Sequence, residues 1–208
     1  MSDQDHLKKL IALLRLAYSA ELAAACAYRG HWHSVSDANE RGRILQIENE
    51  EWHHRKLVGE MLKKLGTLPS RARELRATVV GRVLGTLCHL TGGLAPMYGA
   101  GRLESRNIRE YETAARYARA AGHDEFADCL LMMAEVDWEH EKYFRSRVLS
   151  HLLGRRLAIW SEPPPREMIR KSFANSAESA LLDQEAASLA GDRVEVPLDA
   201  VVISQHAE

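Results

Sequence analysis

The chain carries the same four-residue pattern twice, each time inside a segment of helical periodicity. Residues 51–54 read Glu-Trp-His-His and residues 137–140 read Asp-Trp-Glu-His, so both are acid, tryptophan, any residue, histidine. Residues three apart on a helix share a face, which turns the acid and the histidine of each pattern to the same side. The sequence therefore predicts two helices that each present an acid and a histidine to one place.

Two further glutamates extend this pattern to the helices that come before. Glu21 is followed seven residues later by Tyr28, and Glu104 is followed seven residues later by Tyr111. The two glutamates precede the acid of the next pattern by 30 and 33 residues. This agreement indicates that one helix pair has been used twice, with the same polar residues in the same places.

Hydrophobic periodicity predicts four long helices, at residues 5–33, 39–65, about 96–121 and 123–153. Ser36 or Asp37 could cap the second helix, and Gly66 and Gly122 follow the second and third. Long helices with short connections pack against one another as a bundle. We therefore predict an all-α, four-helix bundle that covers residues 1–155.

The segment between the second and third helices is less regular. Residues 71–82 are rich in arginine, whereas residues 83–101 contain no Asp, Glu, Lys or Arg. Five glycines and Pro96 make one straight membrane-spanning helix a poor interpretation of residues 83–101. A helix broken around residues 92–96 fits better.

Residues 156–208 are predicted to be a C-terminal extension that is partly helical or disordered. Three consecutive prolines at 163–165 form a rigid break. Residues 166–190 could form one more helix. Residues 192–208 could be a strand, an ordered extension or disorder.

Six side chains of the repeated pattern form a candidate metal site: Glu21, Glu51, His54, Glu104, Asp137 and His140. Four carboxylates and two imidazoles from four helices are the ligand set of carboxylate-bridged dimetal bundles. Oxygen and imidazole ligands together suit iron or manganese. A single Glu-x-x-His on a helix is common at the surface, but Glu21 lies among small apolar residues, where an unpaired carboxylate is costly. We therefore predict two iron ions, with manganese as an alternative.

The aromatic residues and other histidines near this pattern have plainer interpretations. Tyr28 and Tyr111 either hydrogen-bond groups around the metal or fill the core, and core packing is the preferred interpretation. Trp52 and Trp138 are also predicted to pack in the core. The run His-Trp-His at residues 31–33 lies near a helix end and is predicted to be a solvated or interface patch.

Composition excludes several classes of protein. The chain is 46% hydrophobic and 27% charged, with a net charge of −1, which is typical of a soluble globular protein and does not favour a nucleic-acid partner. Three cysteines without a Cys-x-x-Cys pair argue against a disulfide scaffold or a rubredoxin centre. The polar residues 1–10 do not resemble a signal peptide, so we expect a cytoplasmic protein.

These motifs resemble the demethoxyubiquinone hydroxylase family, the ferritin-like di-iron monooxygenases of ubiquinone biosynthesis. The family's first-helix motif, AGExGAxxIYxGQ, keeps its Glu, Tyr and Gly here at residues 19–31. The acid-Trp-x-His patterns and the glycine-rich stretch before Glu104 also match, and the resemblance covers about residues 15–150. Asp137 departs from the family's usual Glu, and Glu110 stands where the family commonly has His.

The resemblance implies hydroxylation of a hydrophobic quinone-type ring with O2. Glu21 and Glu104 would each bind one metal, Glu51 and Asp137 could bridge both, and the two histidines would be terminal ligands. Residues 79–103 could contact the inner face of a membrane peripherally, and a homodimer is one arrangement to test. The alternatives are a ferritin-like iron-binding or iron-storage protein and a rubrerythrin-like protein that reduces peroxide; the lack of Cys-x-x-Cys weakens the latter.

Overall fold

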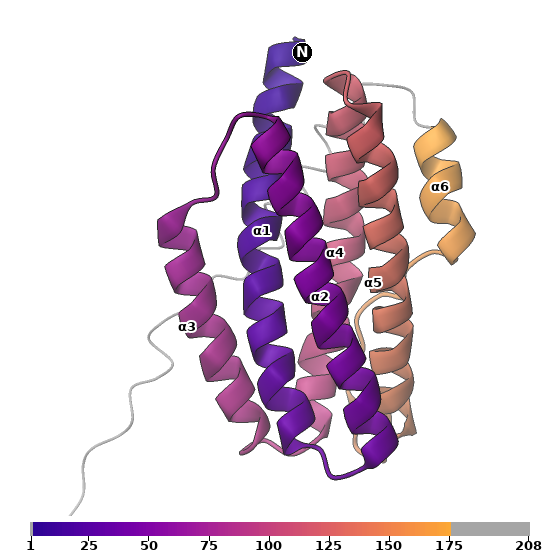
Figure 1. The fold of residues 1–208 in the computed structure, drawn as a ribbon. Coiled ribbons are helices and arrows are strands. Elements are labelled where there is room, and N and C mark those ends of the chain that lie inside the picture. The colour runs from indigo at the N-terminus through magenta and orange to yellow at the C-terminus, as the bar shows by residue number, and fades with distance from the viewer. Residues whose placement is uncertain (1, 176–208) are drawn as a thin grey trace, which may run out of the picture.

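The structure, a computed structural model, describes residues 2–175, and the regular elements of this part of the chain are all helical (Figure 1). They are α1 (Asp3–Ser34), α2 (Ala38–Lys64), α3 (Arg71–Cys88), α4 (Leu94–Ala120), α5 (Asp124–Ser150), a short 3-10 turn η1 (Gly154–Arg156) and α6 (Arg166–Asn175). The prediction of an all-α protein is confirmed.

Helices α1, α2, α4 and α5 form the bundle (Figure 1). The most extensive packing is between α1 and α2 and between α4 and α5, and α1 also packs on α4. Aliphatic and aromatic residues fill the interior, among them Leu10, Leu14, Ile108, Tyr117 and Phe144, all at most 2% exposed. Burial of such side chains stabilises the fold by about 1.5–3 kcal/mol each.

The predicted helix ends lie close to the observed ones. The Asp37 side chain caps α2 by accepting a hydrogen bond from the Glu40 amide at 2.8 Å. Gly66 and Gly122 follow α2 and α4 with φ of 64° and 79°, a left-handed conformation that glycine adopts without strain. The fourth predicted helix ends at Ser150, earlier than the predicted residue 153.

Residues 71–88 form a regular fifth helix, α3, which lies against α1 outside the bundle (Figure 1). The contact is so close that a Cβ on Gly30 would lie 2.3 Å from Cα of Gly85, and a Cβ on Gly81 would lie 2.5 Å from the carbonyl oxygen of Ala23. Glycine at these positions lets the two backbones approach. The predicted break lies at residues 89–93, slightly earlier than expected, so Pro96 falls in the first turn of α4.

The chain after α5 runs back along α4 and α5. Residues 157–165, called the strap below, are fixed by side chains of the bundle: Tyr98 Oη donates to the carbonyl oxygen of Ala158 at 2.7 Å, and Trp138 Nε1 donates to that of Pro164 at 2.8 Å. Helix α6 begins directly after the prolines, as predicted. The predictions for residues 176–190 and 192–208 lie outside the described residues.

Within residues 2–175 one helix, α1, is long and apolar enough to cross a membrane by length and composition alone. A core helix of a soluble bundle passes the same test, and α1 contributes buried side chains such as Leu10, Leu14 and Tyr28 to the bundle interior.

Candidate metal centre

The six predicted ligand side chains meet in the interior of the bundle. They come from α1 (Glu21), α2 (Glu51 and His54), α4 (Glu104) and α5 (Asp137 and His140), and none is more than 2% exposed. Charged groups at this depth are rare unless they are paired or bind a metal. The sequence pattern therefore identified residues that the fold brings together from four separate helices.

Two groups of ligand atoms form within this cluster. In each group the candidate atoms lie within 4.8 Å of one another, and each could hold a metal ion: Glu51, Glu104, Asp137 and His140 in one, and Glu21, Glu51 and His54 in the other. Glu51 belongs to both groups. The arrangement is that of two adjacent positions that share a carboxylate.

Many polar atoms of the centre have no hydrogen-bond partner although they are buried. They are Oε2 of Glu21, both carboxylate oxygens of Glu51, Nδ1 of His54, Oε2 of Glu104, both carboxylate oxygens of Asp137 and Nδ1 of His140. Leaving buried acceptors unsatisfied costs about 1–3 kcal/mol each, and more when they are charged. A bound cation would satisfy this set together, so the donor set fits a metal centre.

Two tyrosines each donate a hydrogen bond to a candidate glutamate ligand on the other helix of the α1–α4 pair. Tyr28 of α1 donates its hydroxyl hydrogen to Oε1 of Glu104 on α4, and Tyr111 of α4 donates to Oε1 of Glu21 on α1. Burial first, and then the nearby carboxylates, raise the pKa of both hydroxyls well above 10, so they remain donors. Both rings pack in the hydrophobic core, as preferred from the sequence, and their hydroxyls also orient candidate ligands, so both interpretations hold.

Glu50 is a functional residue that the sequence reasoning missed. Its Oε2 lies 2.6 Å from Nε2 of His140, while Nδ1 of the same ring faces Glu51 Oε1 at 3.3 Å. Burial raises the pKa of Glu50, but the hydrogen bond and charge of His140, with smaller contributions from Gln46 and Arg43, together outweigh it and the net shift is downward. No pattern in the sequence indicated this role, because a residue next to a ligand on a helix is expected to face elsewhere.

Crowded carboxyl groups at the centre bind protons tightly. Burial raises the pKa of Glu51 to about 7, and the charge of Glu104 adds to the effect. Burial, followed by neighbouring carboxylates, also raises the pKa of Glu21 and Asp137 well above the usual range. A cation that binds here would displace these protons.

The two histidines respond in opposite directions. Burial lowers the pKa of His54 to about 3, and the charge of His140 adds to this. Burial also acts to lower the pKa of His140, but the nearby carboxylates of Glu104, Glu50 and Glu51 together outweigh it and raise the pKa well above 6.5. The neutral form of His54 can bind metal without losing a proton, whereas His140 must lose one.

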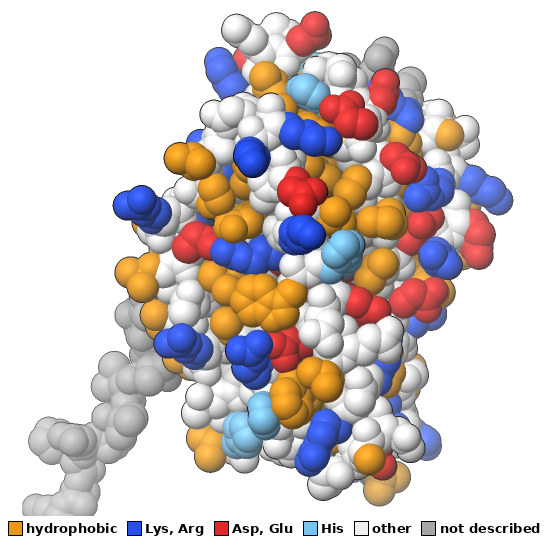
Figure 2. All heavy atoms as spheres, viewed as in Figure 1, with side chains coloured by type: hydrophobic (Ala, Val, Ile, Leu, Met, Phe, Trp, Pro, Cys, Tyr) orange, Lys and Arg blue, Asp and Glu red, His pale blue; other side chains and the backbone are white. Residues whose placement is uncertain are grey.

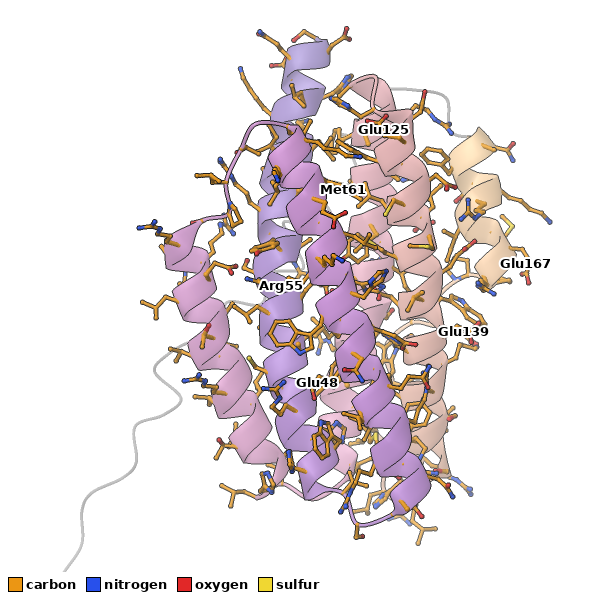
Figure 3. The ribbon with its side chains drawn as sticks, in the orientation of Figure 1. Glu48, Arg55, Met61, Glu125, Glu139 and Glu167 are labelled. Atoms are coloured by element: carbon orange, nitrogen blue, oxygen red, sulfur yellow. The ribbon has the colours of Figure 1, made fainter. Side chains whose placement is uncertain are left out.

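A buried acid beside the centre is satisfied by protein groups. Glu48 of α2 accepts hydrogen bonds from Arg29 Nε at 2.9 Å, Trp32 Nε1 at 2.6 Å and Trp52 Nε1 at 3.2 Å; Figure 3 shows Glu48 on the side of α2 toward α1. His31 is buried and stacks on Phe144 with ring centroids 6.3 Å apart. The predicted solvated patch at residues 31–33 is therefore wrong for His31 and for Trp32, since both belong to the packed end of α1.

Comparisons with protein-family models, curated proteins and solved structures give no match to this chain. The interpretation of the centre therefore depends on its own geometry and donor set.

Proposed function

We propose that this chain is a ferritin-like di-iron protein that uses O2 to hydroxylate a quinone-type ring, as demethoxyubiquinone hydroxylases do. The observation that carries the proposal is the pair of ligand groups that share Glu51 in a dry bundle interior. The crosswise hydrogen bonds of Tyr28 and Tyr111 support the idea that one helix pair was duplicated. Manganese is the alternative metal, because carboxylates and imidazoles suit both ions.

Each candidate ligand has a role in this proposal. Glu51 would bridge the two ions, since it belongs to both groups, and Asp137 is a second bridging candidate. Glu21 and Glu104 would each present the oxygen that its tyrosine leaves unoccupied. A bound iron pair would supply electrons to activate O2. The chain itself buries the centre and orients the carboxylates.

The outer face of α3 suggests where a hydrophobic substrate could be collected. Six large apolar side chains of this helix are exposed, namely Leu75, Val79, Val80, Val83, Leu84 and Leu87, and four exposed arginines accompany them, at positions 71, 73, 76 and 82. Figure 2 shows hydrophobic and basic side chains interspersed at the edge that α3 forms. An apolar face with arginines suits the anionic inner surface of a membrane. We therefore propose a cytoplasmic protein that binds this surface through residues 79–103.

The first test is metal content joined to product formation. Elemental analysis of the purified chain should find about two irons per chain. The reduced protein, given demethoxyubiquinone and O2, should yield a product that is heavier by one oxygen atom, and Glu51→Ala should abolish both results. Iron bound without such a product, but with a mineral core in a large shell, would support iron storage. Peroxide consumption without quinone oxidation would support a rubrerythrin-like role.

The second test is co-sedimentation with lipid vesicles. Binding to vesicles that contain anionic phospholipid, but not to zwitterionic ones, is expected, and the double variant Val79→Asp, Val83→Asp should lose it. Leu152→Asp is the matched control, because Leu152 is exposed but lies beyond α5. A concentration-dependent dimer that the same double variant disrupts, without any vesicle binding, would assign this face to a homodimer instead.

A further inference from the structure

The centre is closed to solvent, so a metal ion needs a route into it. Glu51, Glu104, Asp137 and His140 are 0% exposed. A small cavity lies in the seam between α1 and α4, and its lining includes Ala17, Ala20, Glu21, Asn107, Glu110 and Tyr111. It has room for about one water molecule. A quinone ring is too large for this cavity, whereas a single ion that has shed its water can occupy it.

Polar groups along the cavity become more buried toward the centre. The Glu110 side chain is 14% exposed, Asn107 is 7% exposed and Glu21 is 2% exposed. Oε2 of Glu21 is buried and has no partner, because Tyr111 occupies only Oε1. Glu110 is fixed near the outside by Arg106, whose Nε donates to Oε1 at 2.7 Å. Two oxygen-bearing side chains, Glu110 and Asn107, thus lie between the surface and Glu21 along the cavity lining.

We propose that this seam is the path by which divalent metal ions enter the centre, with Glu110 as the outer cation-binding residue, Asn107 as the intermediate one and Glu21 as the first ligand reached. The proposal rests on the metal centre assigned above. It gives a role to Glu110, which is not one of the six ligands.

The physical reason is the cost of removing water from the ion. A hydrated divalent cation is larger than the cavity, so it must exchange its water for other oxygen ligands as it enters. Carboxylate and carboxamide oxygens are suitable replacements. Arg106 balances the charge of Glu110 until an entering cation replaces the guanidinium as the partner of this carboxylate. A carboxylate at the mouth of a low-dielectric passage then favours the entry of cations.

The seam between α2 and α5 is the competing route, and it is closed by the protein itself. Glu50 is partly exposed there, but the ring of His140, which is 0% exposed, lies between Glu50 and the remaining candidate ligands of the centre, of which Glu50 is not one. One ring nitrogen bonds Glu50 and the other faces Glu51. An ion on this side would have to displace a candidate ligand before it could enter.

The test is the rate at which Co2+ enters the metal-free protein, followed by stopped-flow absorbance, with the equilibrium dissociation constant measured in parallel. Glu110→Gln keeps the size of the side chain and removes its charge. We expect association about tenfold slower, or slower still, in this variant. Ala20→Leu, which adds a side chain to the cavity lining, should slow association as well. Glu112→Gln is the matched control, because residue 112 lies on the opposite side of α4, where its side chain meets Ser172 of α6.

A residue that lowers only the barrier to entry changes association and dissociation by the same factor, so Glu110→Gln should change the dissociation constant far less than the association rate. An unchanged association rate in Glu110→Gln would overturn the proposal, and so would slower entry in Glu50→Gln alone. A weaker equilibrium affinity with normal association would make Glu110 a ligand and overturn it too. If the wild-type chain binds neither Co2+ nor iron, the metal centre itself is wrong. If metal enters as proposed but no quinone product forms, only the proposed reaction is rejected.

Discussion

The helix pair α1–α2 and the helix pair α4–α5 have similar inner faces and different outer faces. Each pair contributes one glutamate, one acid and histidine three residues apart, and one tyrosine that bonds the other pair's glutamate. On the outside, α1 is covered by α3 through close glycine contacts, whereas α4 and α5 are covered by the strap and α6. The inner positions serve one shared centre, but each outer face has to fit a different neighbour.

The two tryptophans of the repeated pattern illustrate this difference. Trp52 donates its ring hydrogen to Glu48 one turn earlier on its own helix, whereas Trp138 donates to the backbone of the strap at Pro164. The residues occupy the same place in the pattern and have different partners. The residues before the two acids differ as well: Glu50 supports His140, while Val136 at the matching place offers no side-chain acceptor.

The largest expected effect is on metal content, and it compares a variant of the ligand that both groups share with a variant of a ligand that belongs to one group. Glu51 belongs to both groups, so Glu51→Ala should empty both positions, whereas His54→Ala should affect only the group that contains Glu21. Elemental analysis after reconstitution should find metal lost entirely from the first variant and reduced by about half in the second. Equal residual metal in the two variants would contradict the two-position arrangement.

The second prediction concerns the stability of the metal-free protein at different pH. The pKa of Glu51 rises from 4.5 to about 7 on folding, and those of Glu21 and Asp137 rise too. The stability from these raised values is complete below the unfolded pKa and is lost as the pH rises through the folded one. His54 and His31 oppose this, because their lowered pKa values cost stability as the pH falls below 6.5. The second ligand histidine, whose pKa is raised, acts in the same direction as the carboxyl groups. These four groups should outweigh the two opposing histidines.

Thermal melting should therefore show the metal-free protein losing stability between about pH 5 and about pH 7.5. Glu51→Gln should reduce this loss and stabilise the metal-free protein near neutral pH. Metal binding should reverse the slope, because binding becomes tighter as the protons leave. A metal-free protein that gains stability over this range would show that His54 and His31 dominate, and that the carboxyl groups are less crowded than the geometry indicates.

The third prediction tests the unequal support of the two histidines. Glu50→Gln should weaken metal affinity roughly tenfold, mainly through faster dissociation, because the group that orients His140 loses its charge. Isothermal titration with Mn2+ would measure the change. Glu139→Gln is the control: this acid directly precedes His140 in sequence but faces Arg166 at 3.8 Å, and Figure 3 places it on the outer side of α5. Equal losses of metal affinity in both variants would mean that Glu50 acts only as a general negative charge and does not orient His140.

Much of the bundle could be predicted because its signals are local. Periodicity located the four bundle helices, and Asp37, Gly66 and Gly122 located their ends. A helix broken near residues 92–96 was predicted, but the packing of its first part, α3, along α1 was not, because the glycines of α3 weaken a helical interpretation when read alone. They become favourable only against α1, where Gly81 and Gly85 allow the backbones to touch. This is a tertiary effect that a single segment does not encode.

The inner residues of the centre were also predictable, since spacing on a helix fixes which side chains share a face. Their supporting groups were not. Whether Tyr28 packs or donates depends on Glu104, which lies on another helix 76 residues away. Glu50 reaches His140 across the bundle, over 90 residues. Contacts between helices depend on rotation and offset in the packed state, which periodicity leaves open.

The smallest expected effect tests the outer faces. Trp138→Phe removes the hydrogen bond to Pro164 and should cost about 1 kcal/mol, with the strap cleaved faster in limited proteolysis. Trp52→Phe removes a longer hydrogen bond to Glu48, which Arg29 and Trp32 continue to hold, so the strap should remain protected. Mass spectrometry of the fragments identifies the cleavage site. If both variants expose the strap equally, the outer faces are coupled through the bundle and do not respond independently to their own covers.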